Sequence, residues 1–385
     1  MRRAYKFRVY PNRNQMREME IMLETHRRLY NACLAQRKDA WEQEERSVKY
    51  TEQSAWYKQE RDVNPYFKRL NFSSAQATMR RLNKSFQNFF RRVKAGEKPG
   101  YPRFKGRGRF RCIEFPAYGD GVKLVNGKLR VQHVGKIRIK QHRDIEGLIK
   151  TVSLKEEAGK WYAVFSCDLR DVEVEPSTKP PVGIDVGIES FLTTNDGTHV
   201  ENPKFLATTL PELRRAGRAV SRKQLRGKNR KKAVTRLRRL HARVREQRRD
   251  YHHKVALALI RSYGVIAVES LSIRGMVKNH RLARHISDAA WGSFLSILEH
   301  KAESAGVEVI RVNPAGTSQE CSDCGTTVKK PLSVRVHNCP SCGLRLHRDE
   351  NAARNILARG LLARTEPVGH NVDGCIKRAP RSRLL

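Results

Sequence analysis

Four cysteines near the end of the chain have the spacing of a metal site. Cys321 and Cys324 form one Cys-x2-Cys pair, fourteen residues follow, and Cys339 and Cys342 form the second pair. Two such pairs are typical of a zinc ribbon, in which four thiolates hold one tetrahedral Zn²⁺. Because four protein thiolates leave no open coordination position, we expect a structural rather than a catalytic zinc.

Three acidic residues occur where a charge is costly to bury. Asp185 and Glu269 lie at the ends of the apolar runs VGID and VIAVE, and Asp349 precedes ENAARNIL, whose spacing predicts a helix. A carboxylate among apolar strand residues needs a partner or a metal ion. Three converging carboxylates could hold two Mg²⁺ ions, or Mn²⁺ in their place, for phosphodiester hydrolysis. Each acid alone could instead cap a strand end or, at Asp349, a helix.

The elements that must position these acids follow an α/β pattern from residue 180 onward. VGIDVGIESFLTTNDGTHV predicts a buried strand, a tight glycine turn, a second strand and a hairpin, while YGVIAVESLSI and VEVIRVNP predict two more strands. RLARHISDAAWGSFLSILEHKAESAG predicts one amphipathic helix. Asp288 in that helix is either an auxiliary carboxylate near the acids or a solvated helix residue.

The preceding part of the chain predicts a small β-barrel that a helical insertion interrupts. Residues 4–10 alternate as a half-buried strand does, and short alternating runs return over residues 112–170. Asn126-Gly127 between two of those runs indicates a hairpin. Apolar stripes between the strands predict helices over residues 15–45 and 73–93.

The charge of the chain indicates a polyanionic partner. Lys+Arg 78 against Asp+Glu 39 gives a formal net charge of +39, and residues 214–249 hold seventeen Lys or Arg against one acid. Nucleic acid would neutralise this charge, although a basic run can also be a solvated helix face. Residues 94–111 interleave cations with rings, as a loop that follows a phosphate backbone and stacks on bases does; a solvated linker is the alternative. Its candidate contacts are Tyr101, Arg103, Lys105 and Arg107, with the rings of Phe104 and Phe110 also free to stack.

Several motifs together resemble a known family. VGIDVGIESF, IAVESLSIRGM, HISDAAWGSF, the four-cysteine ribbon and HRDENAARNIL are similar to the TnpB (OrfB) family of transposon-encoded, RNA-guided DNA endonucleases, which are related to the type V CRISPR effectors. The resemblance covers nearly the whole chain and implies an α+β multidomain protein. The implied parts are a wedge β-barrel (1–12 and 112–179), a helical recognition lobe with the basic loop (13–111), a RuvC-like nuclease domain of RNase H fold (180–316 and 347–360), a zinc-ribbon insert that binds target nucleic acid (317–346) and a flexible basic tail (361–385).

The same resemblance implies roles for individual residues. Asp185, Glu269 and Asp349 match the first, second and third catalytic acids, whereas His347 stands where the family often has a further acid that is not a metal ligand. The implied activity is metal-dependent cutting of DNA beside a short adjacent motif. The implied partners are a guide RNA from the transposon end, double-stranded target DNA and the displaced single strand. Gln76 is a candidate for reading the motif, since Gln can bond adenine, or it is an ordinary helix-surface residue.

Two other functions stay open at this point. One is a nuclease-inactive, guide-directed DNA-binding repressor, which the presence of all three acids disfavours, and the other is a DNA transposase that joins strands. Four lone cysteines and the absence of a signal peptide or of an apolar run near 20 residues lead us to expect a cytoplasmic, prokaryotic, nucleoid-associated protein with no membrane contact. We expect it to be monomeric with its RNA. The lone cysteines are Cys33, Cys112, Cys167 and Cys375.

Overall fold

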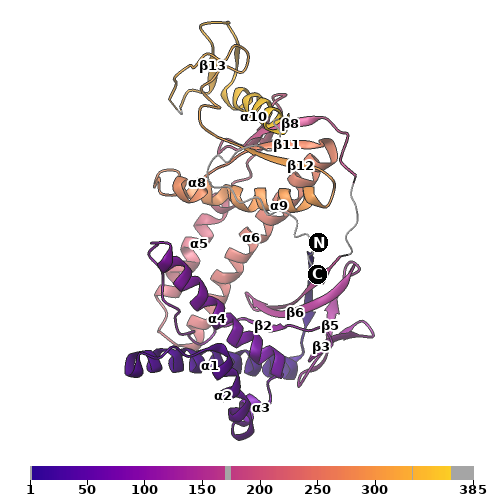
Figure 1. Cartoon of the computed structure of the whole chain (residues 1–385), viewed down its shortest axis with the longest axis vertical. Coiled ribbons are helices and arrows are strands. Elements are labelled where there is room, and N and C mark those ends of the chain that lie inside the picture. The colour runs from indigo at the N-terminus through magenta and orange to yellow at the C-terminus, as the bar shows by residue number, and fades with distance from the viewer. Residues whose placement is uncertain (1, 170–174, 332, 366–385) are drawn as a thin grey trace. The chain divides into compact units, whose positions relative to one another are not determined.

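The computed structural model describes residues 2–169, 175–331 and 333–365. It divides the chain into two compact units, Met1–Val172 and Glu173–Leu385, each a mixture of helices and strands as the sequence predicted (Figure 1). The last helix, α10 (Arg348–Thr365), continues five residues into the expected tail. The remainder of that tail, residues 366–385 with Cys375, lies outside the described residues.

The first unit is built on one antiparallel sheet with the strand order β2–β6–β7–β1–β5–β4–β3. The sheet curls (Figure 1), yet its two edge strands do not pair with each other within the described residues. Each edge strand is only four residues long, and short edge strands are a common way to end a sheet. The predicted barrel is therefore an open, curled sheet. Its strands are β1 (Arg2–Tyr10), β2 (Cys112–Phe115), β3 (Val122–Val125), β4 (Lys128–Val131), β5 (Gly135–Lys140), β6 (Leu148–Glu157) and β7 (Lys160–Asp168).

The predicted hairpin in this sheet is confirmed. β3 and β4 pair from Val122↔Val131 to Val125↔Lys128. Asn126 and Gly127 between them have φ values of +48° and +67°. A two-residue turn of type I′ needs positive φ at both positions, which Asn and Gly tolerate best.

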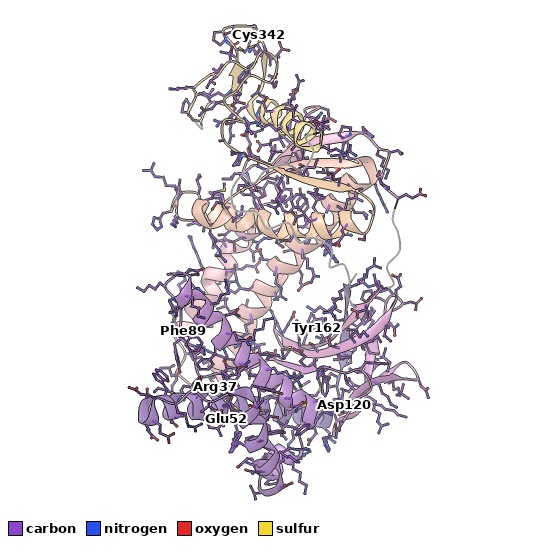
Figure 2. All side chains as sticks on the ribbon, in the orientation of Figure 1. Arg37, Glu52, Phe89, Asp120, Tyr162 and Cys342 are labelled. Carbon is purple, nitrogen blue, oxygen red and sulfur yellow. The ribbon has the colours of Figure 1, made fainter. Side chains whose placement is uncertain are left out.

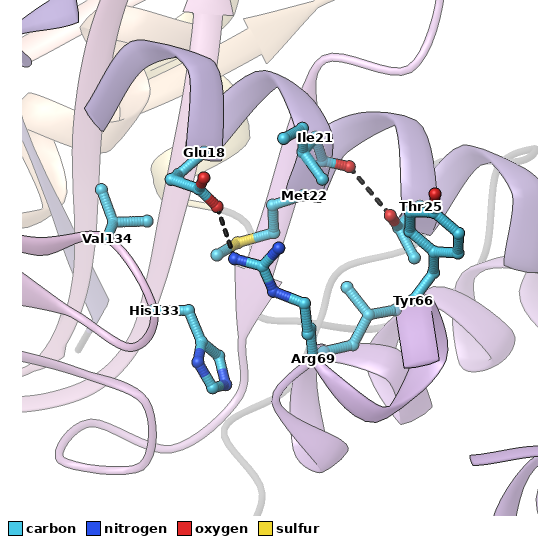
Figure 3. A pocket seen from close by; sticks show the side chains of 9 residues that line it. Glu18, Ile21, Met22, Thr25, Tyr66, Arg69, His133 and Val134 are labelled. Atoms are coloured by element: carbon cyan, nitrogen blue, oxygen red, sulfur yellow. Dashed lines mark hydrogen bonds and ion pairs between the residues drawn. The ribbon is translucent and has the colours of Figure 1, made fainter. Parts of the chain in front are cut away.

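Four helices lie between β1 and β2 in the chain. The two predicted ones are present as α1 (Arg13–Glu44) and α4 (Phe72–Lys94), whereas α2 (Tyr50–Val63) and α3 (Pro65–Lys68) were not anticipated. Asn12 begins α1 with a capping box. Its side chain accepts a hydrogen bond from the Gln15 backbone amide, and the Gln15 side chain accepts one from the Asn12 backbone amide. A cavity of about 20 Å³ next to α1 has room for about one water. It is bordered by the Glu18–Arg69 ion pair at 2.6 Å (Figure 3).

The second unit is built on a five-stranded sheet with the order β10–β9–β8–β11–β12. The three strands β8 (Pro181–Asp185), β11 (Val265–Glu269) and β12 (Glu308–Val312) are parallel. β9 (Ser190–Thr194) and β10 (His199–Glu201) continue the sheet antiparallel. All five strands were predicted, and Asp185 and Glu269 are the last residues of neighbouring parallel strands.

Helices cover both faces of this sheet. α6 (Lys228–Ser262) and α9 (Trp291–Glu303) pack on the face that shows Ile266 and Val268, and α10 packs on the face that shows Ala267. α5 (Phe205–Ser221) pairs with α6. The helix expected around Trp291 is broken into α8 (Ala283–Ala289) and α9, because Ala290 between them has φ +51°. A short helix, α7 (Ile273–Met276), follows β11.

Two glycines allow α10 to approach the sheet closely. A Cβ on Gly183 in β8 would overlap the Ala353 carbonyl oxygen and lie 2.7 Å from the Leu357 amide nitrogen. A Cβ on Gly360 would lie 2.6 Å from the Cβ of Ala267. Only glycine fits at such a close approach of two backbones. Since Asp349 lies one turn before Ala353, this packing also brings Asp349 to the end of β8.

Within the described residues, no helix is long and apolar enough to cross a membrane.

Candidate active site

The four cysteines form a compact cluster in the second unit. Their sulfur atoms all lie within 4.8 Å of one another, with 3.6 Å between Cys321 and Cys342 and 3.5 Å between Cys324 and Cys339. These separations are too long for disulfide bonds. They are close to the edge of about 3.8 Å expected for a tetrahedron of thiolates at the usual zinc–sulfur distance. The donor set therefore fits one Zn²⁺ with no open position.

The two knuckles of the ribbon have the same backbone geometry. The amides of Gly325 and Gly343 donate to the carbonyls of Cys321 and Cys339, both at 3.0 Å. Both glycines have φ +75°, which glycine adopts without strain. A short hairpin of β13 (Val336–Asn338) and β14 (Arg345–His347) joins the second knuckle to α10. Figure 2 labels Cys342 on the ribbon.

The three predicted acids meet at one edge of the sheet. Val268 pairs with Ile184, so the next residues, Glu269 and Asp185, end adjacent strands, and α10 supplies Asp349 from its first turn. Burial, the charge of Glu269 and the charge of Asp349, in that order, raise the pKa of Asp185 well above its usual value. Mutual repulsion of this kind requires that the carboxylates lie near one another.

This acid cluster is more widely spaced than the cysteine cluster. Among the described residues, the four cysteines have donor atoms that all lie within 4.8 Å of one another, and the three acids do not meet this limit. Two metal ions about 3.5–4 Å apart can be bridged by oxygens that are themselves further apart. Carboxylate oxygens are the ligands that Mg²⁺ and Mn²⁺ prefer, so the residues present fit such ions.

A hydrogen bond holds Glu269 to the start of the ribbon. The Thr317 hydroxyl donates to Glu269 Oε1 at 2.6 Å, and both side chains are buried. Burial raises the pKa of Glu269, while this hydrogen bond and the charge of Arg359 oppose the rise. Sequence reasoning did not find Thr317, because a lone threonine in an irregular segment carries no periodic signal.

Two asparagines of α10 hold the same segment from the other side. Asn351 accepts from the Ser322 amide at 2.9 Å and donates to the Glu320 carbonyl at 2.6 Å. Asn355 donates to the Thr317 and Glu320 carbonyls, both at 2.8 Å. The residues just before and after Cys321 are therefore tied to the helix that carries Asp349.

Basic residues approach Asp349 from the ribbon. Arg335 lies 2.8 Å from Glu189 and 3.7 Å from Asp349. His347 Nδ1 lies 4.0 Å from Asp349 Oδ2. The position where the family often has an acid is thus occupied by an imidazole next to the third acid.

Asp288 is not the solvated helix residue that was one of the two expectations for it. It is buried, and its carboxylate accepts from the amides of Leu206 and Ala207 at 2.9 and 3.1 Å and pairs with Arg248 at 3.1 Å. The carboxylate caps the start of α5. Both carboxylate oxygens of Asp288 take part in these contacts, so the side chain is not solvated.

The candidate nucleic-acid contacts all lie in the first unit. Tyr101 is 45 % exposed and packs edge-on against Phe86 and Phe89 of α4; Figure 2 labels Phe89. The backbone of Lys105 is held by Asn31 of α1 at 2.8 Å, which anchors the basic loop. Arg103 and Arg107 are exposed, whereas Gln76 is half-buried.

One ring of the basic loop was wrongly predicted to be free. Phe110 is 5 % exposed. Its ring lies parallel to His26, with ring centroids 6.2 Å apart, and Arg81 lies over it. Phe104, in contrast, is 52 % exposed. The loop therefore offers Tyr101 and Phe104 for stacking and uses Phe110 in the core.

Three family models match separate parts of the chain. OrfB_IS605, described as "Probable transposase", matches residues 164–280, and the Cas12f1-like TNB domain matches residues 291–356, which include the four cysteines. HTH_OrfB_IS605, described as a helix-turn-helix domain, matches residues 1–46. In the structure that last segment is strand β1 followed by the single long helix α1.

Relatives and one solved structure extend over most of the chain. The "Putative RNA-guided DNA endonuclease" of Streptomyces pristinaespiralis is 36% identical over 94% of this chain and 90% of its own. InsQ of Escherichia coli K12, which carries the same description, is 30% identical over 93% and 92%. The structure of the mini-RNA-guided endonuclease CRISPR-Cas_phi3 is 10% identical, covers 96% of this chain and 94% of its own, and has a TM-score of 0.51, which is a likeness of fold. The fold is thus of the kind seen in that effector, and the chain itself belongs to the TnpB (OrfB) family.

Proposed function

We propose that the protein is an RNA-guided DNA endonuclease of a transposable element that hydrolyses phosphodiesters of target DNA at Asp185, Glu269 and Asp349. The observation that carries this proposal is that three carboxylates meet at one edge of a sheet. The first and the last of them, Asp185 and Asp349, are 164 residues apart in sequence. Burial, followed by the charges of Glu269 and Asp349, raises the pKa of Asp185. A cluster that disfavours its own charge is typical of a metal-dependent catalytic site.

Asp185, Glu269 and Asp349 would hold two Mg²⁺ ions, or Mn²⁺. When bound, such ions stabilise the charge that develops on the phosphate and lower the pKa of the attacking water. The chain's own contribution is to fix the carboxylates. Thr317 orients Glu269, and the Asn351 and Asn355 side chains hold α10 so that Asp349 faces the ends of β8 and β11.

We assign the other parts of the chain to binding. The curled sheet and helices of the first unit would act as wedge and recognition lobe, where Gln76 and the loop residues Tyr101, Arg103, Lys105 and Arg107 contact nucleic acid. The RuvC-like second unit would cut, and the zinc ribbon would grip the target strand. The partners would be a guide RNA from the transposon end, target duplex and the displaced strand. Base pairing would then supply most of the sequence specificity.

The first test removes the acids. Asp185→Ala or Glu269→Ala should abolish guided DNA cleavage in Mg²⁺ while leaving guide and target binding within about twofold, since these side chains would touch only the metal ions. Glu303→Ala, which removes an exposed carboxylate at the end of α9 in the same unit, serves as the control and should cut normally. Loss of target binding in the acid variants would contradict this division of roles.

The second test identifies the RNA. Sequencing of the RNA that copurifies with the full chain should give one main species that ends at a transposon boundary. Guided binding without any nicking would favour the repressor function. Strand-transfer products formed without added RNA would favour the transposase function.

A further inference from the structure

A cavity of about 530 Å³ lies between α6 and α9 of the second unit, on the face of the sheet opposite α10. Figure 1 shows these two helices as neighbours in the second unit. We name this cavity the α6/α9 groove. The residues that line it are Arg245, Arg248, Arg249, His252 and His253 of α6, Ala290, and Ser293, Ser296, Ile297, His300 and Lys301 of α9.

The groove follows from helical periodicity. The wall residues recur on each helix at i, i+3, i+4, i+7 and i+8, starting from Arg245 on α6 and from Ser293 on α9. Such a series lies along one face of a helix. Two faces that meet in this way would normally form an apolar interface. Here the deeper residues His252 and Phe294 pack together in the core, with ring centroids 5.8 Å apart, and the outer positions are basic or polar.

The groove has a net positive charge, with Arg245 paired to Glu246 at 2.8 Å and Arg248 paired to Asp288, neither of which is a wall residue. Three arginines and one lysine line it, and none of its wall residues is acidic. Arg248 is fixed in place by the buried carboxylate of Asp288, and its buried Nε has no hydrogen-bond partner among the described residues. Arg249, by contrast, is exposed. A concave surface with this charge concentrates phosphate anions.

The groove begins at the edge of the sheet that holds the acids. α9 runs back along the sheet and leads through a short turn into β12, which is parallel to β11. The start of α9, with Ala290 and Ser293, therefore lies toward the end of β11 where Glu269 is found. A nucleic-acid strand that lies in the groove could continue around this edge of the sheet to the acid cluster.

We propose that the α6/α9 groove binds the phosphodiester backbone of a single nucleic-acid strand. This inference deepens the proposed function and rests on it for the identity of the strand, which is either the guide RNA or the displaced DNA. A volume of about 530 Å³ is in the range of pockets that enclose small molecules, and it suits one or two nucleotides of a strand rather than a duplex. Arg249 and Lys301, on opposite walls, would each contact a phosphate.

The test measures the salt dependence of binding by the full chain. The probes are fluorescein-labelled single-stranded RNA and single-stranded DNA of equal length and sequence. For a single strand, the slope of log K against log salt changes by about 0.7 for each phosphate contact. Arg249→Gln with Lys301→Gln should therefore make the slope shallower by about 1.4. The control is Lys254→Gln, which removes one charge from the opposite side of the same helix, where Lys254 is exposed and pairs with Asp250 at 2.7 Å.

Each outcome decides the matter. A shallower slope in the double variant with an unchanged slope in Lys254→Gln supports the groove, and the probe with the larger change identifies the strand; equal changes assign the site to phosphodiesters of either kind. A wild-type slope in the double variant, or a drop in Lys254→Gln of the same size per charge, overturns it. Because binding needs no cleavage, absence of guided cleavage in the wild type would refute the proposed function without touching this result.

Discussion

Thr317 joins the zinc ribbon to the acid cluster through one hydroxyl group. Its oxygen is 2.6 Å from Glu269 Oε1 and 3.1 Å from the Pro314 carbonyl, and its single hydrogen serves the shorter of these contacts. The Thr317 carbonyl accepts from Asn355 of α10 at 2.8 Å. Thr317 is therefore hydrogen-bonded both to Glu269 and to α10, the helix that carries Asp349.

We predict that Thr317→Val lowers guided cleavage by about 10-fold or more, the usual effect of losing a residue that orients a metal ligand. Valine keeps the shape of threonine and removes the hydrogen bond to Glu269. Calorimetric titration with Mn²⁺ should show weaker metal binding in this variant, and Thr317→Ser should restore it. Unchanged Mn²⁺ affinity in Thr317→Val would show that the hydroxyl does not position Glu269.

His26 is a fully buried imidazole in the first unit. Its Nδ1 lies 2.9 Å from the Thr78 hydroxyl and its Nε2 lies 3.3 Å from the Ser74 hydroxyl. Burial, followed by the charge of Arg81, lowers the pKa of His26 to about 3. The neutral ring is therefore part of the packing between α1, α4 and Phe110.

This shift makes the stability of the first unit depend on pH. The folded state has the lower pKa, so the unfolded state binds more protons below its own pKa of 6.5, and stability falls as the pH drops through that value. We expect His26 alone to remove about 2 kcal/mol of unfolding free energy between pH 7 and pH 5. Urea unfolding followed by tryptophan fluorescence would measure this. His26→Gln should lessen the pH dependence by that amount, and an identical dependence in both proteins would contradict the assignment.

At the scale of elements, the site depends on how closely α10 approaches the sheet. Gly183 and Gly360 leave no room for a Cβ between α10 and the strands β8 and β11. The acid cluster is assembled from two strand ends and the first turn of this helix. Any outward movement of α10 would separate Asp349 from Asp185 and Glu269.

We predict that Gly183→Ala destabilises the second unit by about 1–3 kcal/mol, the usual cost of overpacking, and lowers cleavage more than binding. The matched control is Gly217→Ala within α5, where an added Cβ meets nothing within 4 Å. That substitution should be neutral or stabilising by up to about 1 kcal/mol, because alanine favours helices. Equal effects of the two substitutions on thermal unfolding would refute the close-packing argument.

At the scale of the whole molecule, the two units have separate cores. The core of the first unit includes Tyr5, Leu29 and Phe165, and that of the second includes Ile184, Ile266 and Phe294. The zinc ribbon belongs to the second unit alone. Units with separate cores can unfold in separate transitions.

We predict that Cys339→Ser, or removal of zinc by a chelator, lowers the unfolding temperature of one calorimetric transition and leaves the other unchanged. The ribbon would lose its fold, and the contacts of Asn351 and Asn355 that hold α10 would be lost with it. Guided cleavage should fall together with the zinc content. Cys112→Ser, at a lone and half-buried cysteine of the first unit, is the control and should keep one zinc per chain. Full cleavage by zinc-free protein would contradict the coupling.

Features that depend on the local spacing of residues could be predicted from the sequence. Two Cys-x2-Cys pairs predicted the sulfur cluster, Asn126-Gly127 predicted its hairpin, and short apolar runs predicted the buried strands that end in Asp185 and Glu269. These signals succeed because turn geometry and a short apolar run are properties of a few neighbouring residues. Which distant residues meet could be seen only in the folded chain. It brought Asp349 beside Asp185, placed Thr317 on Glu269, buried Phe110 against His26 and left the sheet open, since long-range packing is set by the complementary surfaces of whole elements and has no period along the chain.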